Sequence, residues 1–110
     1  MRLKEYQNGA ARTAIFPNEL PSFIEVGQVY VVLGEGGENG EIQEKLKKAI
    51  REEDYEYIEE MRGEVGDTLW YLSQVCEEFD WSLEQIAQEN LNKLSDRQQR
   101  GQLTGQGDKR

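Results

Sequence analysis

The sequence predicts an all-α protein of about four helices. Apolar residues recur at helical spacing near residues 3–15, 22–52 and 54–79 and again from Ser82 onward, and no segment alternates long enough to compete as a strand. At 110 residues the chain forms one domain. A chain of this size buries only about 65% of its unfolded surface. We therefore expect a partner subunit to help complete the core of a single domain over residues 1–100.

The first two helices are separated by a loop. Leu3, Tyr6, Ala10 and Ala14 have helical spacing, and two prolines then interrupt the chain before the long helix over residues 22–52. That helix carries a narrow apolar stripe, which is expected to face the protein. The stripe contains Ile24, Gln28, Val31, Ile42, Leu46 and Ala49.

The long helix has a weak point at residues 33–40, where four glycines fall within seven positions. Each glycine costs about 1 kcal/mol in a helix interior. The segment can be read as a loop, as a phosphate-cradling loop that lacks the Gly-Lys-Ser/Thr ending, or as a helix that allows close approach of a backbone, ligand or metal. We favour the helix, because the apolar period resumes in phase at Ile42.

The third helix, over residues 54–79, has its own apolar stripe, and Asp80 and Trp81 form a short break after it. Ser82 and Gln85 have the spacing of a capping box, and Trp81 is placed to pack on Ile86, so a fourth helix starts at Ser82. Residues 101–110 are rich in Gly and Gln and are expected to form a flexible tail without ligand. The third-helix stripe contains Ile58, Met61, Val65, Leu69, Leu72, Cys76 and Phe79.

Composition excludes several functional classes. The net charge of −9 argues against a nucleic-acid binder, and the absence of an 18-residue apolar run argues against a membrane span. No histidine is present, which removes Ser-His triads and the usual zinc sites. Cys76 is the only cysteine and is expected to be a packing residue. The N-terminus lacks the apolar core of a signal peptide, so we expect a cytoplasmic protein.

Two acidic pairs carry the chemistry. Glu35 and Glu38 lie inside the apolar stripe, and Glu64 and Asp67 lie at the edge of the next one, with twenty-five residues between the pairs. Residues three apart are neighbours on a helix, so each pair presents two adjacent carboxylates. At about 5 Å such a pair repels by roughly 3 kcal/mol, and four converging carboxylates need cations. Hard oxygen ligands suit Mg²⁺ or Mn²⁺. The alternative is a set of ordinary solvated carboxylates.

Two groups of cations accompany these acids. Lys48 belongs to a basic cluster that follows the first acidic pair, and one or two residues of this cluster could reach a phosphate. The cluster contains Lys45, Lys47, Lys48 and Arg51. Asn90, Lys93, Arg97 and Arg100 form a strip on the fourth helix, which is either a solvated basic edge or a cationic rail facing the acids. Tyr71 shares the face of Glu64, seven residues beyond it.

These residues resemble the MazG-like family of all-α nucleoside triphosphate pyrophosphohydrolases. The family signature, Glu-x-x-Glu followed after a spacer by Glu-x-x-Asp, is similar to Glu35–Glu38 and Glu64–Asp67, the latter continuing into Leu-Trp-Tyr. The similarity covers residues 24–110 in the family's order, although Asn39 and Gly40 depart from its pattern. It extends to the blocks at residues 47–51, 90–97 and 105–110.

The resemblance implies an antiparallel helical bundle that forms a homodimer or homotetramer. It implies Mg²⁺-dependent cleavage of a nucleoside triphosphate to the monophosphate and pyrophosphate, with metal bound by Glu35, Glu38, Glu64 and Asp67. Tyr71, Asn90, Lys93 and Arg97 are then candidates for phosphate and sugar contacts, and Trp70 for stacking on a base. A carboxylate not saturated by metal, such as Glu38, could accept the proton of water.

Two other functions stay open. The first is a non-enzymatic helical oligomerisation module whose acidic face is solvated. The second is a metal-dependent phosphodiesterase that uses the same carboxylates. The position of Glu35 and Glu38 inside an apolar stripe favours an enzyme over a module, because a pure interaction helix has no reason to place acids there.

Overall fold

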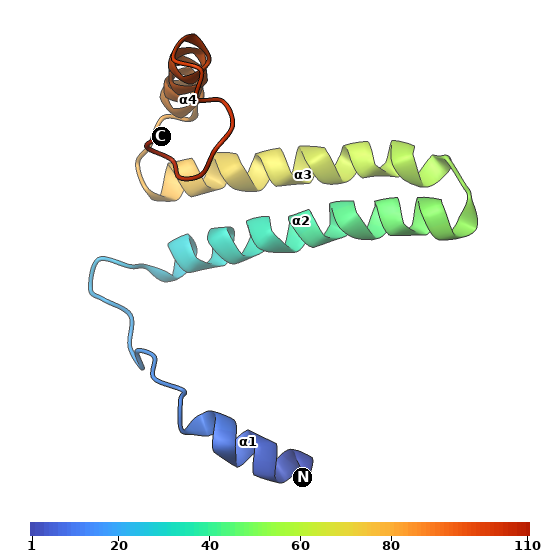
Figure 1. The fold of residues 1–110 in the computed structure, drawn as a ribbon, viewed down its shortest axis with the longest axis vertical. Helices are drawn as coiled ribbons and strands as arrows, with labels where there is room; N and C mark the ends of the chain where they lie inside the picture. Colours follow the sequence, from blue (N-terminus) through green and yellow to red (C-terminus); the bar gives the residue numbers. More distant parts are fainter.

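The computed structural model describes residues 1–110 as four helices without strands, which confirms the all-α prediction. α2 and α3 lie side by side and antiparallel, α1 stands apart beyond an extended segment, and α4 projects from the end of α3 (Figure 1). No helix is both long enough and apolar enough to cross a bilayer. The helices are α1 (Leu3–Ala11), α2 (Val26–Glu52), α3 (Glu56–Glu78) and α4 (Leu83–Gln99).

The glycine-rich segment is helical throughout, as the resumed apolar period predicts. α2 runs without a break through residues 33–40. One glycine there is required by packing, because a Cβ on Gly34 would overlap three carbons of the Tyr71 ring on α3. Nothing lies within 4 Å of the corresponding positions on Gly36, Gly37 and Gly40. Packing against α3 therefore outweighs the low helix propensity of this segment.

Polar contacts at both ends fix the register of the α2–α3 hairpin. At the open end, Gln28 accepts a hydrogen bond from the Glu25 backbone N–H at 2.8 Å and donates one to the Glu78 carbonyl at 3.3 Å. Near the turn, Lys45 on α2 pairs with Glu60 on α3 at 3.0 Å. These contacts and the Gly34–Tyr71 approach set which carboxylates meet midway along the hairpin.

Two helix ends differ from the sequence prediction by four residues, and the other predicted ends lie within two residues of the observed ones. The first helix ends at Ala11 rather than residue 15. The backbone N–H groups of residues 12–14 donate to carbonyls three residues earlier instead of four, and the Thr13 hydroxyl donates to the Ala10 carbonyl. The second begins at Val26 rather than residue 22, since Glu25 and Gln28 cap it. At α4, the Ser82 side chain accepts from the Gln85 backbone N–H, but Gln85 turns its own side chain to Glu89. The predicted capping box is therefore half formed.

The face of α3 that packs on α2 is rotated from the predicted stripe. Val65, Leu69 and Leu72 were expected in the core, yet they are 53%, 59% and 41% exposed. Glu64 and Tyr71 are half-buried on the side towards α2. Val31 and Cys76 are the only buried apolar residues, which confirms the packing role of Cys76. The chain thus leaves a large apolar surface without a partner.

A pair of glycine substitutions tests the helical packing. We expect Gly34→Ala to lower stability by about 1–3 kcal/mol, because the new methyl group displaces the Tyr71 ring. Gly36→Ala, which meets nothing within 4 Å, should raise stability by up to about 1 kcal/mol through helix propensity. Urea denaturation measures both. Equal effects of the two substitutions would contradict the Gly34–Tyr71 contact.

Candidate metal and nucleotide site

Three carboxylates from the two packed helices converge midway along the hairpin. Glu38 projects from α2, and Glu64 and Asp67 project from α3, with one oxygen of each lying within 4.8 Å of the others. Glu38 and Glu64 are half-buried, whereas Asp67 is exposed. The group therefore opens to solvent on one side while its α2 member is held between the helices.

The most constrained atom of the group is one oxygen of Glu38. Its Oε2 is inaccessible to solvent and has no hydrogen-bond partner. Burial raises the pKa of Glu38 above its ordinary value of 4.5, and the neighbouring Glu64, Asp67 and Glu41 carboxylates raise it further. A buried, unpartnered carboxylate oxygen beside like charges is unfavourable unless a proton or a cation joins it.

A hard divalent cation fits this group. Three converging carboxylates are the oxygen donors that Mg²⁺ and Mn²⁺ prefer, and the unpartnered Oε2 of Glu38 supplies the free lone pair. The nearby Lys45 is paired with Glu60, and although its charge also acts on Glu64, a single ammonium group offsets three carboxylates only in part. The residues present therefore fit a divalent ion on physical grounds.

Glu35 stands apart from the three-carboxylate group. It is half-buried on α2, one turn before Glu38, but its oxygens are not among those that lie within 4.8 Å of one another. Neighbouring side chains three residues apart still share a helix face. Glu35 is therefore placed beside the group rather than in it.

Of the candidate substrate residues on the hairpin, Tyr71 and Lys48 are half-buried and Trp70 is exposed. The Tyr71 ring packs against Gly34 and meets the Trp70 ring edge to face, with 4.9 Å between the ring centroids. Lys48 is half-buried on α2, about three turns beyond Glu38. The Lys45–Glu60 pair was not anticipated, because sequence spacing does not reveal which residues of an antiparallel helix face each other.

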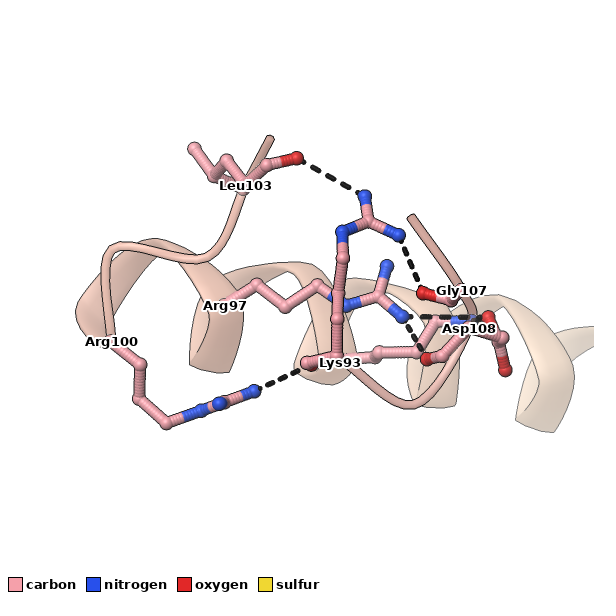
Figure 2. A network of polar contacts seen from close by, with 7 residues as sticks. Lys93, Arg97, Arg100, Leu103, Gly107 and Asp108 are labelled. Carbon is pink, nitrogen blue, oxygen red and sulfur yellow. Dashed lines mark hydrogen bonds and ion pairs between the residues drawn. The ribbon is translucent and has the colours of Figure 1, made fainter. Parts of the chain in front are cut away.

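The candidate residues on α4 lie away from the three carboxylates in the single chain. Asn90 is exposed, while Lys93 and Arg97 bind Asp108 of the C-terminal segment (Figure 2). Residues 101–110, for which composition predicts flexibility, thus lie along α4 here, and their mobility stays a prediction. The groove at the α3–α4 turn, which is lined by Trp81 and Ile86 among others, contains none of the three carboxylates.

The raised pKa of Glu38 predicts how pH affects the metal-free protein. The folded state binds more protons than the unfolded state between pH 4.5 and the raised pKa of Glu38. The resulting stabilisation is complete below the unfolded pKa and is lost as pH rises through the folded pKa. We therefore expect melting in chelator to show wild type losing stability relative to Glu38→Gln as pH rises above 4.5. Parallel melting curves would contradict this prediction.

Comparison with known proteins shows which family the chain belongs to. The profile of the family described as "MazG nucleotide pyrophosphohydrolase domain" matches residues 36–101, which include Glu38, Glu64, Asp67 and all of α4. The chain is also 39% identical over 114 aligned positions to "Gene 37 protein" of Mycobacterium phage L5, and the alignment covers 100% of both chains. No solved structure matches. The chain belongs to the MazG nucleotide pyrophosphohydrolase domain family.

Proposed function

We propose that this chain is a Mg²⁺-dependent nucleoside triphosphate pyrophosphohydrolase. It hydrolyses an NTP or dNTP between the α and β phosphates and releases the nucleoside monophosphate and pyrophosphate. The observation that carries the proposal is the group of Glu38, Glu64 and Asp67 with its buried, unpartnered oxygen, inside the region matched by the family.

The acidic residues hold the ion and handle the proton. Glu38, Glu64 and Asp67 bind it, and Glu35, one turn away, joins them. Bound Mg²⁺, or Mn²⁺ in its place, neutralises phosphate charge and acidifies water. Glu38 would hold the ion through one oxygen, which leaves its other oxygen to accept the proton of the attacking water.

Substrate contacts come from α2, α3 and α4. Lys48, Lys93 and Arg97 bind phosphates, Tyr71 and Asn90 bind phosphate or sugar, and Trp70 stacks on the base. In one chain only α2 and α3 pack extensively on each other, so the α4 residues reach the carboxylates through assembly.

The assembly is a homodimer or homotetramer. The chain has a radius of gyration of 19.8 Å, whereas a compact chain of this length has about 13 Å. Its accessible surface is 9476 Å², against about 6,200 Å² for a folded monomer of this mass. The excess of about 3,300 Å² per chain is well above the roughly 800 Å² that each partner buries in a standard interface, and is of the size that large obligate interfaces bury. A second copy of the chain is therefore the expected partner for the exposed apolar face.

The test is a panel of NTPs and dNTPs with Mg²⁺, followed by ³¹P NMR of the products. The proposal requires monophosphate and pyrophosphate in equal amounts and no reaction in chelator. Release of single phosphate, or turnover of no nucleotide, contradicts it. Absence of turnover together with an intact oligomer would favour the interaction module instead.

A further inference from the structure

The C-terminal segment forms a basic island on an acidic protein. Residues 93–110 hold five of the thirteen Lys and Arg residues but only two of the twenty-two Asp and Glu residues. One of those acids, Asp108, lies between two cations of α4 (Figure 2). Its Oδ1 is 2.5 Å from Lys93 Nζ and 3.5 Å from Arg97 Nη2, which also donates to its backbone carbonyl. These cations hold the pKa of Asp108 below its ordinary value, chiefly through the hydrogen bond from Lys93.

Arg97 is buried by the tail rather than by another helix. It is only 4% exposed, although α2 and α3 are the only helices that pack extensively on each other. Its Nε is inaccessible to solvent and has no hydrogen-bond partner. One carboxylate is thus shared between two cations, one of which is desolvated, so positive charge remains unbalanced. The forked guanidinium and the neighbouring ammonium suit an anion with more charge and more oxygens, such as a phosphate chain.

The tail is held on α4 by polar contacts that an anion can replace. Arg110 donates to the carbonyls of Leu103 and Gly107 at 3.1 and 2.7 Å, and Arg100 donates to the carbonyl of Arg110 at 2.9 Å. Leu103 is half exposed. A segment with few buried apolar contacts opens at low free-energy cost.

We propose that Asp108 is an internal counter-anion held by Lys93 and Arg97, the phosphate contacts of the proposed function, and that the tail leaves α4 when phosphate groups bind. The proposal rests on the proposed function for the phosphate-binding role of Lys93 and Arg97 and for the source of the ligand, a nucleoside triphosphate. Binding itself needs neither metal nor turnover. The tail then competes with substrate in the resting protein and frees Lys93 and Arg97 when the substrate arrives.

The test is calorimetric titration of the full chain with inorganic tripolyphosphate in chelator. Asp108→Asn removes the competing charge and keeps the side-chain shape. Asp96→Asn is the matched control, because it makes the same charge change on α4 but pairs only with Arg100, at 2.8 Å. We expect Asp108→Asn to bind about three- to fivefold more tightly than Asp96→Asn, the amount expected from a largely exposed ion pair. Equal or weaker binding by Asp108→Asn overturns the proposal.

Two further measurements separate competition from other roles. Lys93→Gln and Arg97→Gln should each weaken tripolyphosphate binding at least about tenfold, as expected for loss of a charged hydrogen bond. Unchanged affinity in both would remove the site. NMR reports tail release through the amide signals of Gly101, Gly105 and Gly107. As tripolyphosphate is added, these signals should become narrower and their chemical shifts should move to random-coil values. Chemical shifts that stay unchanged at saturation contradict tail release. None of these measurements depends on hydrolysis. Tripolyphosphate binding can therefore be found in a protein that hydrolyses no nucleotide, and hydrolysis can be found in a protein whose tail does not compete for phosphate.

Discussion

Glu38→Gln should abolish nucleotide hydrolysis while leaving the helices folded. The substitution removes the charge from the one carboxylate of the group that has a buried, unpartnered oxygen. Loss of residues that merely orient a metal ligand costs 10–100-fold, so loss of a ligand should cost more than about 100-fold in kcat/KM. The effect is measured by pyrophosphate release at saturating Mg²⁺, and circular dichroism reports the fold.

The matched control is Glu41→Gln. Glu41 lies on the same helix three residues further on, is exposed and is not part of the three-carboxylate group. It should retain most of the activity. Activity in Glu38→Gln close to that of Glu41→Gln would show that the ion is held elsewhere.

Leu69→Asp should dissociate the assembly and unfold the chain at micromolar concentration. Leu69 is 59% exposed in the single chain, on a face shared with Val65 and Leu72. Burial of a leucine against a partner stabilises by about 1.5–3 kcal/mol, and an unpaired carboxylate in its place costs several kcal/mol more. A twofold interface repeats the loss in both subunits. Sedimentation velocity and thermal melting measure the two effects.

Leu69→Met is the control for this prediction. It conserves volume and apolar character, so it should keep the oligomer with a cost below about 1.5 kcal/mol. A wild-type protein that sediments as a monomer, or a Leu69→Asp protein with the mass of wild type, contradicts assembly through this face.

Local sequence patterns predicted the helices more fully than their packing. The resumption of apolar spacing at Ile42 correctly indicated a helix through the glycines, because α2 is stabilised along its length by α3. Periodicity also predicted burial of Val65, Leu69 and Leu72, which are 53%, 59% and 41% exposed in the single chain. An apolar stripe has the same spacing whether it faces a core or a subunit interface, so the pattern alone does not predict what covers it.

The candidate site shows the same limit. The spacing placed Glu35 and Glu38 together on one stripe, but only Glu38 meets Glu64 and Asp67 in the three-carboxylate group. The register of α3 against α2 decides which acid converges, and it is fixed by long-range contacts such as Gly34 with Tyr71. The partnership of Lys93 and Arg97 with Asp108 was likewise invisible, because it joins a helix to a segment without periodic structure.

The central claim is that Glu38, Glu64 and Asp67 hold a divalent ion in the assembled protein. A crystal grown with Mn²⁺ tests it directly, because anomalous scattering locates the ion without assumption. We predict a peak within about 2.0–2.3 Å of carboxylate oxygens from both α2 and α3, with Glu38 among them. Carboxylates directed to bulk solvent throughout the oligomer, with no peak between them at high Mn²⁺, would contradict the account.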